Sequence, residues 1–146
     1  MKRIAVLLVL IGSAASLLAA DAAHTFYIQL VRGTDTAKPP QPGCHQAGPR
    51  LAATFRPVFS WKHYWAVRCR PVPLRPGEKR RLRLGSGREV EIDLGQPKER
   101  KITTFRNGKV LDRTISPAGD HMTIIGDNRE AKSAWFVVVR PDKPKD

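Results

Sequence analysis

The side chains with the most evident chemistry are basic, and they gather in the middle of the chain. Residues 61–94, WKHYWAVRCRPVPLRPGEKRRLRLGSGREVEIDL, combine aromatic rings with a dense run of arginine and lysine. Cationic groups pair with phosphate and carboxylate groups, and aromatic rings stack on sugars and bases. The sequence therefore predicts a polyanion-binding surface formed by Arg68, Arg70, Lys79, Arg80, Arg81, Arg83 and Arg88, beside an aromatic platform of Trp61 and Tyr64.

An alternative interpretation exists for the rings: Trp65 and one of Trp61 or Tyr64 are anchors of the hydrophobic core. The sequence leaves this choice open.

Patterns that would support catalysis are weaker. Phosphate-loop and dinucleotide-binding glycine motifs are absent, and no G-x-S-x-G motif surrounds Ser60, Ser86, Ser116 or Ser133. Glu89, Glu91 and Asp93 fall on one face of a predicted strand and could imitate the acid pair of a glycosidase. A solvated strand face opposite arginines is the commoner origin of such spacing. We therefore predict a non-catalytic protein without a cofactor, and keep a small hydrolase as the weakest alternative.

The chain has two cysteines, Cys44 and Cys69. In an exported protein an isolated pair usually forms a disulfide, so we expect this bond to hold residues 33–50 against the strand that contains Trp65. The alternative is a metal site made of Cys44, His45, His63 and Cys69. Its spacing matches none of the compact zinc motifs, so we predict a disulfide and no metal.

The first residues have the features of a secretory signal peptide. Lys2 and Arg3 precede an apolar run over residues 4–20, and Ala20-Asp21-Ala22 resembles an A-x-A cleavage site. We predict a signal peptide over residues 1–22, with an uncleaved membrane anchor as the alternative, because the run is at the lower edge of the length that spans a bilayer. The mature chain is then periplasmic or secreted, and no second apolar stretch is long enough for a transmembrane span.

The length and charge of the remaining chain suggest one basic domain. We assign residues 23–140 to a single β-domain and residues 141–146 to a flexible tail. Removal of the signal peptide lowers the formal net charge from +13 to +12, because Lys2, Arg3 and Asp21 leave with it. Such a surplus favours attraction to anionic surfaces, although an arginine-rich composition can also serve only solubility.

Alternation of apolar and polar residues predicts the strands. Expected strands cover residues 24–32, 65–71, 79–84, 89–94, 102–106, 109–115, 121–126 and 134–140, with a short helix near residues 51–55. The run WFVVV lacks alternation and indicates a central strand that is covered on both faces. This is an all-β fold, a small antiparallel β-sandwich or barrel of about seven to eight strands.

Turn-forming residues predict two hairpins, the end of one strand and one loop. Gly85-Ser86-Gly87 joins the first hairpin, in which Lys79, Arg81 and Arg83 face Glu89, Glu91 and Asp93. Asn107-Gly108 joins the second, with Phe105 opposite Val110 and Thr104 opposite Leu111. The proline-rich segment is expected to end its strand at Pro71, and residues 127–133 are expected to form a loop.

These features support three functions. The leading one is an exported β-domain that docks to a protein partner of the cell envelope or outside the cell, by strand addition at an open sheet edge with little salt sensitivity. The second is a binder of lipopolysaccharide, acidic glycans or nucleic acid, whose affinity falls steeply with salt. The third is the hydrolase. Export argues against a genomic DNA target.

Overall fold

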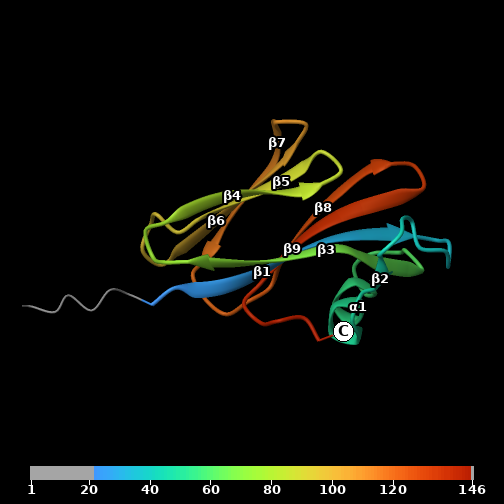
Figure 1. Cartoon of the computed structure of the whole chain (residues 1–146), viewed down its shortest axis with the longest axis horizontal. Coiled ribbons are helices and arrows are strands. Elements are labelled where there is room, and N and C mark those ends of the chain that lie inside the picture. Colours follow the sequence, from blue (N-terminus) through green and yellow to red (C-terminus); the bar gives the residue numbers. More distant parts are fainter. Residues whose placement is uncertain (1–21, 146) are drawn as a thin grey trace, which may run out of the picture.

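The computed structural model describes residues 22–145, apart from the side chains of Asn128 and Arg129. All but the last residue of the predicted signal peptide lies outside this range. The described chain forms two antiparallel sheets packed face to face, with one short helix (Figure 1). The predicted all-β fold is therefore confirmed, and of the two architectures considered the chain forms the sandwich. The described residues form nine strands instead of the predicted seven to eight, because the short strand β2 lies in a segment expected to be a loop.

The five-stranded sheet has the order β2-β3-β1-β9-β8, and the four-stranded sheet has the order β4-β5-β6-β7. The strands of the first are β1 (His24–Thr34), β2 (His45–Gln46), β3 (His63–Leu74), β8 (Thr123–Glu130) and β9 (Ser133–Arg140). Those of the second are β4 (Lys79–Gly85), β5 (Arg88–Asp93), β6 (Glu99–Arg106) and β7 (Lys109–Pro117). The helix α1 (Pro49–Phe55) follows β2.

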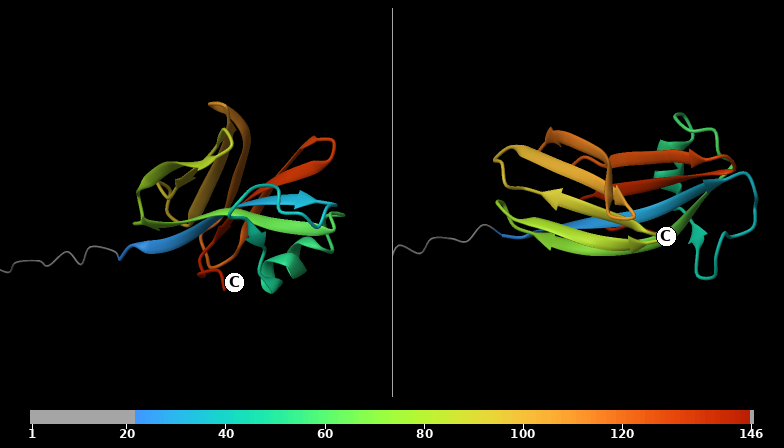
Figure 2. Two further views of the ribbon diagram at one scale, coloured as in Figure 1. Left: turned by 45° about the vertical axis from the view of Figure 1, so that its right-hand side comes forward. Right: turned by 90° about the horizontal axis from the view of Figure 1, so that it is seen from above.

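Two apolar clusters hold these layers together. The first lies between the sheets and includes Phe26, Val72, Ile92 and Trp135. The second lies on the outer face of the five-stranded sheet, where α1 covers it (Figure 2). Alternate residues of β9 enter the two clusters, which explains why all eight residues of this strand are buried. The prediction of a central strand covered on both faces is confirmed.

Both predicted hairpins form. Lys79, Arg81 and Arg83 pair with Asp93, Glu91 and Glu89, as the alternation predicted. Asn107 and Gly108 have φ angles of 49° and 79°, the left-handed values that a two-residue hairpin turn requires. Phe105 lies opposite Val110, but a register shift after Thr104 pairs that residue with Asp112, so the expected pairing with Leu111 is wrong.

Several strands are longer than predicted, and β3 and β8 extend furthest beyond their predicted ends. β3 continues through Pro71 and Pro73 to Leu74, and both prolines stay in register with β1. Proline fits there because residues two apart face the same way, and the missing N–H groups point away from β1. β8 continues to Glu130 and turns into β9 within two residues, so most of the loop expected over residues 127–133 belongs to strands.

The predicted disulfide is wrong, because Cys44 and Cys69 are not bonded to each other. Cys69 is paired with Gln29, which lies on the helix side of the five-stranded sheet. Continuing the β2–β3 register by one residue would place Cys44 opposite Val67, which packs against the cluster between the sheets. The register shift of β3 between Ala66 and Arg68 separates the β2 pairing from Cys69, so the regular alternation along β3 does not align the two cysteines.

The start of the predicted tail makes specific contacts. Asp142 accepts hydrogen bonds from Arg140 and, at 3.0 Å, from Arg50 in the first turn of α1. The hydrogen bond from Arg140 lowers the pKa of the Asp142 carboxyl. Between residues 22 and 145, no helix is long and apolar enough to cross a membrane.

Candidate functional site

The seven predicted polyanion-binding cations occupy two different environments. Six of them are exposed on β3 and β4, namely Arg68, Arg70, Lys79, Arg80, Arg81 and Arg83, whereas Arg88 is only 5% exposed. The six come together because a tight turn joins the two strands. In this turn the N–H of Glu78 donates to the carbonyl of Arg75 at 3.0 Å, and Gly77 has a φ of 86°. The turn carries the chain from one sheet to the other.

A groove of about 350 Å³ lies between β3 and β4. We call it the cationic groove; it is lined by Arg70, Pro71, Val72, Arg80, Leu82 and Arg83. Val72 is buried in the core between the sheets, and Leu82 packs against that core. Arg70 and Arg80 are exposed and come from different sheets. The groove therefore has apolar residues in its base and guanidinium groups from both sheets in its walls.

Acidic partners neutralise only part of this charge. Arg81 and Arg83 share Glu89, at 2.9 Å and 3.6 Å, and the hydrogen bond from Arg81 lowers the pKa of the Glu89 carboxyl. Arg68, Arg70 and Arg80 form no ion pair with any residue that the structure describes. The facing strand β5 therefore neutralises part of the cluster, at Arg81 and Arg83.

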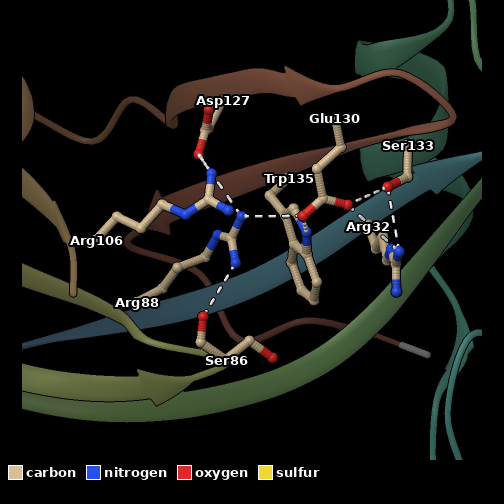
Figure 3. A network of polar contacts seen from close by, with 8 residues as sticks. All are labelled: Arg32, Ser86, Arg88, Arg106, Asp127, Glu130, Ser133 and Trp135. Atoms are coloured by element: carbon tan, nitrogen blue, oxygen red, sulfur yellow. Dashed lines mark hydrogen bonds and ion pairs between the residues drawn. The ribbon is translucent and has the colours of Figure 1, made fainter.

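Arg88 lies between the two sheets, close to acidic residues of β8 (Figure 3). Its guanidinium forms ion pairs with Asp127 at 3.6 Å and Glu130 at 3.8 Å, both on β8 of the opposite sheet. Burial, followed by the nearby charge of Arg106, lowers the pKa of Arg88. Since its side chain is buried and paired, Arg88 is not available to a ligand in the cationic groove.

Glu130 joins the same cluster to β1 and β9. Its carboxylate accepts hydrogen bonds from Ser133 Oγ at 2.6 Å and from Trp135 Nε1 at 3.1 Å, and it pairs with Arg32 at 3.5 Å (Figure 3). The hydrogen bond from Ser133 is the main cause that lowers the pKa of Glu130. Each carboxylate oxygen already has a partner, so this cluster stabilises the sandwich and has no evident catalytic role.

The predicted aromatic platform does not form. Tyr64 is 5% exposed, stacks on Phe55 at 4.7 Å between ring centres, and donates its hydroxyl hydrogen bond to the carbonyl of Phe59. Burial raises the pKa of its phenol. Trp61 is half-buried and packs against the same cluster, next to Gly33. The alternative interpretation, in which Trp65 and one of these rings anchor the core, is the one the structure supports.

Candidates for catalysis are not brought together. Glu89, Glu91 and Asp93 remain on the outer face of β5, and Glu89 and Asp93 pair with Arg81 and Lys101. Within residues 22–145, no three histidine, cysteine or acidic side chains are arranged to hold a metal ion.

The burial of three cations, Arg88, Arg100 and Arg140, was not predicted from the sequence. Arg100 is 1% exposed and lies on the inner face of β6, in alternation with the buried Ile102. The same alternation places Arg88 on the inner face of β5 with Val90 and Ile92. The period-two pattern therefore indicated that Arg88 and Arg100 are buried. Their charge indicated the opposite, because charged side chains are usually exposed.

No protein-family model, curated protein or solved structure matches this chain.

Proposed function

We propose that the protein is a non-catalytic binding domain that attaches to anionic polymers through the cationic groove. The observation that carries this proposal is that Arg70 and Arg80 line one groove from opposite sheets without an acidic partner among the described residues. Guanidinium groups suit this role because they bind phosphate and sulfate oxygens in pairs. Arg68, which lies against Gly85 at the end of β4, extends the row of cations.

The residues that line the cationic groove indicate which class of polymer it binds. Pro71 and Leu82 offer apolar contacts to the faces of sugar rings, while the arginines meet the anionic substituents. Acidic glycans and the phosphorylated sugars of lipopolysaccharide combine these two features. The net charge of +13 adds a long-range attraction that brings such polymers to the domain.

The test is retention of the purified mature domain on immobilised heparin and lipopolysaccharide across a salt gradient. The variant Arg70→Ser/Arg80→Ser should elute at much lower salt, and the slope of log affinity against log salt should fall by about one for each arginine that no longer neutralises an anionic group of the polymer. The matched control is Lys109→Ser/Arg113→Ser, which removes two exposed cations from β7. Equal weakening by both variants would mean that net charge, and not the groove, governs binding.

A second function, docking to a protein partner, is favoured by the edge strand β7. It pairs only with β6, and it carries Val110 and Ile115, which are 51% and 60% exposed. An unpaired edge with apolar side chains can accept a strand from another protein. We propose the cationic groove first because its chemistry specifies a ligand class, whereas the edge specifies only a mode of binding.

The edge can be tested by crosslinking. A photoreactive amino acid at Ile115 should give one discrete adduct in a cell-envelope fraction, and Val110→Lys should abolish it. The same photoreactive group at Lys79 should not give that adduct. Adducts that are diffuse, or equally abundant at the two positions, would contradict docking at β7.

We also propose that the domain acts outside the cytoplasm, because residues 1–22 have the composition of a cleavable signal peptide. Sequencing of the N-terminus of the protein recovered from cells should begin near Ala23. A chain that begins at Met1 would support the membrane-anchor alternative instead.

A further inference from the structure

A larger cavity, separate from the cationic groove, lies at the end of the sandwich where β1 begins. Its volume is about 630 Å³, within the range of small-molecule sites. Five segments form it: the start of β1, the turn between β3 and β4, the β5–β6 loop with the first residues of β6, the β7–β8 loop, and Pro141 after β9. Apolar side chains in its lining include Phe26, Leu94, Pro97 and Ala118.

Arg100 forms part of the wall of this cavity and is 1% exposed. Its Nη2 donates to the carbonyl of His121 at 3.0 Å and to Thr123 Oγ1 at 2.8 Å, and its guanidinium lies 5.6 Å from the centre of the Phe26 ring. Nε and Nη1 have no hydrogen-bond partner, and no acidic residue that the structure describes forms an ion pair with Arg100.

Burial of the Arg100 guanidinium without an ion pair is unfavourable in free energy unless an anion lies beside it. An arginine keeps its charge at physiological pH, and burial of a charge without a counter-charge is strongly unfavourable. Burial lowers the pKa of Arg100, which is the expected sign of this cost. Because water does not screen the guanidinium, its charge acts on the adjacent cavity with unusual strength.

The other charged residues of the cavity lie at its solvent side. Lys98, Glu99 and Asp120 are exposed lining residues, as is His24. Lys98 has a φ of 66°, a left-handed conformation that a lysine seldom adopts, and its carbonyl accepts the N–H of Ala118 at 2.9 Å. Because Glu99 and Asp120 are exposed, water screens their charges, whereas the charge of Arg100 beside the buried Phe26 is not screened in this way.

We propose that this cavity binds an amphipathic anion, with the apolar body against Phe26 and Leu94 and a carboxylate or phosphate group held by the charge of Arg100. The ligand class follows from the combination of a single buried cation with apolar walls. A free fatty acid, a lipid phosphate and a small amphipathic metabolite share this chemistry. The site is independent of the cationic groove, whose residues lie elsewhere on the sandwich.

The experiment is calorimetric titration of the mature domain with decanoate, decyl phosphate, decanol and inorganic phosphate. Decanoate or decyl phosphate should bind, and decanol should bind at least about tenfold more weakly because it lacks the charge. Binding of decanoate but not decyl phosphate would indicate a fatty-acid site, and the reverse a lipid-phosphate site. Inorganic phosphate that binds as tightly as either amphiphile would overturn the role of the apolar walls.

Two variants locate the ligand. Arg100→Met replaces the cation by an apolar side chain of similar length and should abolish the preference for decanoate over decanol, whereas Arg100→Lys should keep part of it. Ala118→Phe fills the cavity from its exposed side without removing the cation and should block both ligands, so the proposal remains testable if Arg100→Met does not fold. Undiminished decanoate binding by Arg100→Met or by Ala118→Phe, or no binding by the wild type, would overturn the proposal.

The groove variant separates this proposal from the first one. Arg70→Ser/Arg80→Ser should lose heparin retention and keep decanoate binding. If it loses both, the decanoate is bound by the cationic groove and the cavity is not the site.

Discussion

The guanidinium carbon of Arg88 lies 4.2 Å from the centre of the Trp135 ring, so a cation from the four-stranded sheet rests on an aromatic ring from the five-stranded sheet. Arg32 approaches the same ring at 5.0 Å. Together with Asp127 and Glu130, these residues link the two layers by charge as well as by apolar packing (Figure 3).

Arg88→Ala should therefore destabilise the domain by about 2–4 kcal/mol, because it removes the cation–π contact and leaves the carboxylates of Asp127 and Glu130, whose side chains are 12% and 35% exposed, with fewer partners. Urea unfolding followed by tryptophan fluorescence measures the change. The control is Arg83→Ala, whose side chain is 91% exposed and which should cost less than about 0.5 kcal/mol. Similar losses in the two variants would contradict the structural role of Arg88.

The lowered pKa of Glu130 predicts how the stability of the domain depends on pH. Its pKa in the folded protein lies below the ordinary value of 4.5, mainly because Ser133 donates a hydrogen bond to it. The unfolded chain takes up the proton first as the pH falls through about 4.5, so the stability that the carboxylate contributes above this pH is lost below it. Melting temperatures measured from about pH 5 to pH 3 should fall less steeply for Glu130→Gln than for the wild type.

The matched control for this pH dependence is Glu91→Gln, on the outer face of β5 away from Trp135. It should retain the steep acid limb of the wild type. A Glu130→Gln variant that retains it too would show that other carboxylates dominate acid unfolding.

Gly33 tests the packing of Trp61. A Cβ atom at this position would lie 2.7 Å from Cδ1 of Trp61, so Gly33→Ala must displace the indole ring. We expect a loss of about 1–3 kcal/mol and a shift in tryptophan emission. Gly119→Ala, whose Cβ would meet no atom closer than 3.5 Å, should change neither quantity appreciably. Unchanged stability and emission in Gly33→Ala would contradict this placement of Trp61.

The cysteines give a chemical test of the strand register. Cys69 is exposed and Cys44 is half-buried. Alkylation of the native, non-reduced protein should label Cys69 first, label both after unfolding, and leave the melting temperature insensitive to reductant. A protein that accepts no label until it is reduced would contain the disulfide that the structure lacks.

Local chemistry was sufficient to predict the hairpins. Asn107-Gly108 and Gly85-Ser86-Gly87 fix their turns through residues close in sequence, and the charges of β4 and β5 face one another because the side-chain period of a strand is two.

Contacts between distant segments were not predictable in the same way. Pro71 remains in β3 because its backbone nitrogen, which has no hydrogen to donate, faces away from β1. That orientation depends on the strand order of the sheet. Arg88 is buried because Asp127 and Glu130, far along the chain, come to lie beside it. The cationic groove and the cavity each combine segments from both sheets, so their shapes follow from packing that no local pattern specifies.

The prolines of β3 also predict how the domain resists self-association. Replacing Pro71 and Pro73 by threonine should restore two outward N–H donors on the free part of this edge. We expect a concentration-dependent increase in mass by analytical ultracentrifugation, whereas the control Pro97→Thr in the β5–β6 loop should sediment as the wild type does. An identical sedimentation profile for the two variants would contradict a protective role for the prolines.

That edge has a wider consequence for assembly. A fibril that grows by strand pairing needs two competent rims on the same sheet, one to receive the preceding molecule and one to offer to the next. In the five-stranded sheet one edge is β8, and the other is β2 together with the length of β3 that carries Pro71 and Pro73. If β8 accepts a strand from a second molecule, we therefore expect the pairing to stop at two molecules, because the prolines interrupt the opposite edge.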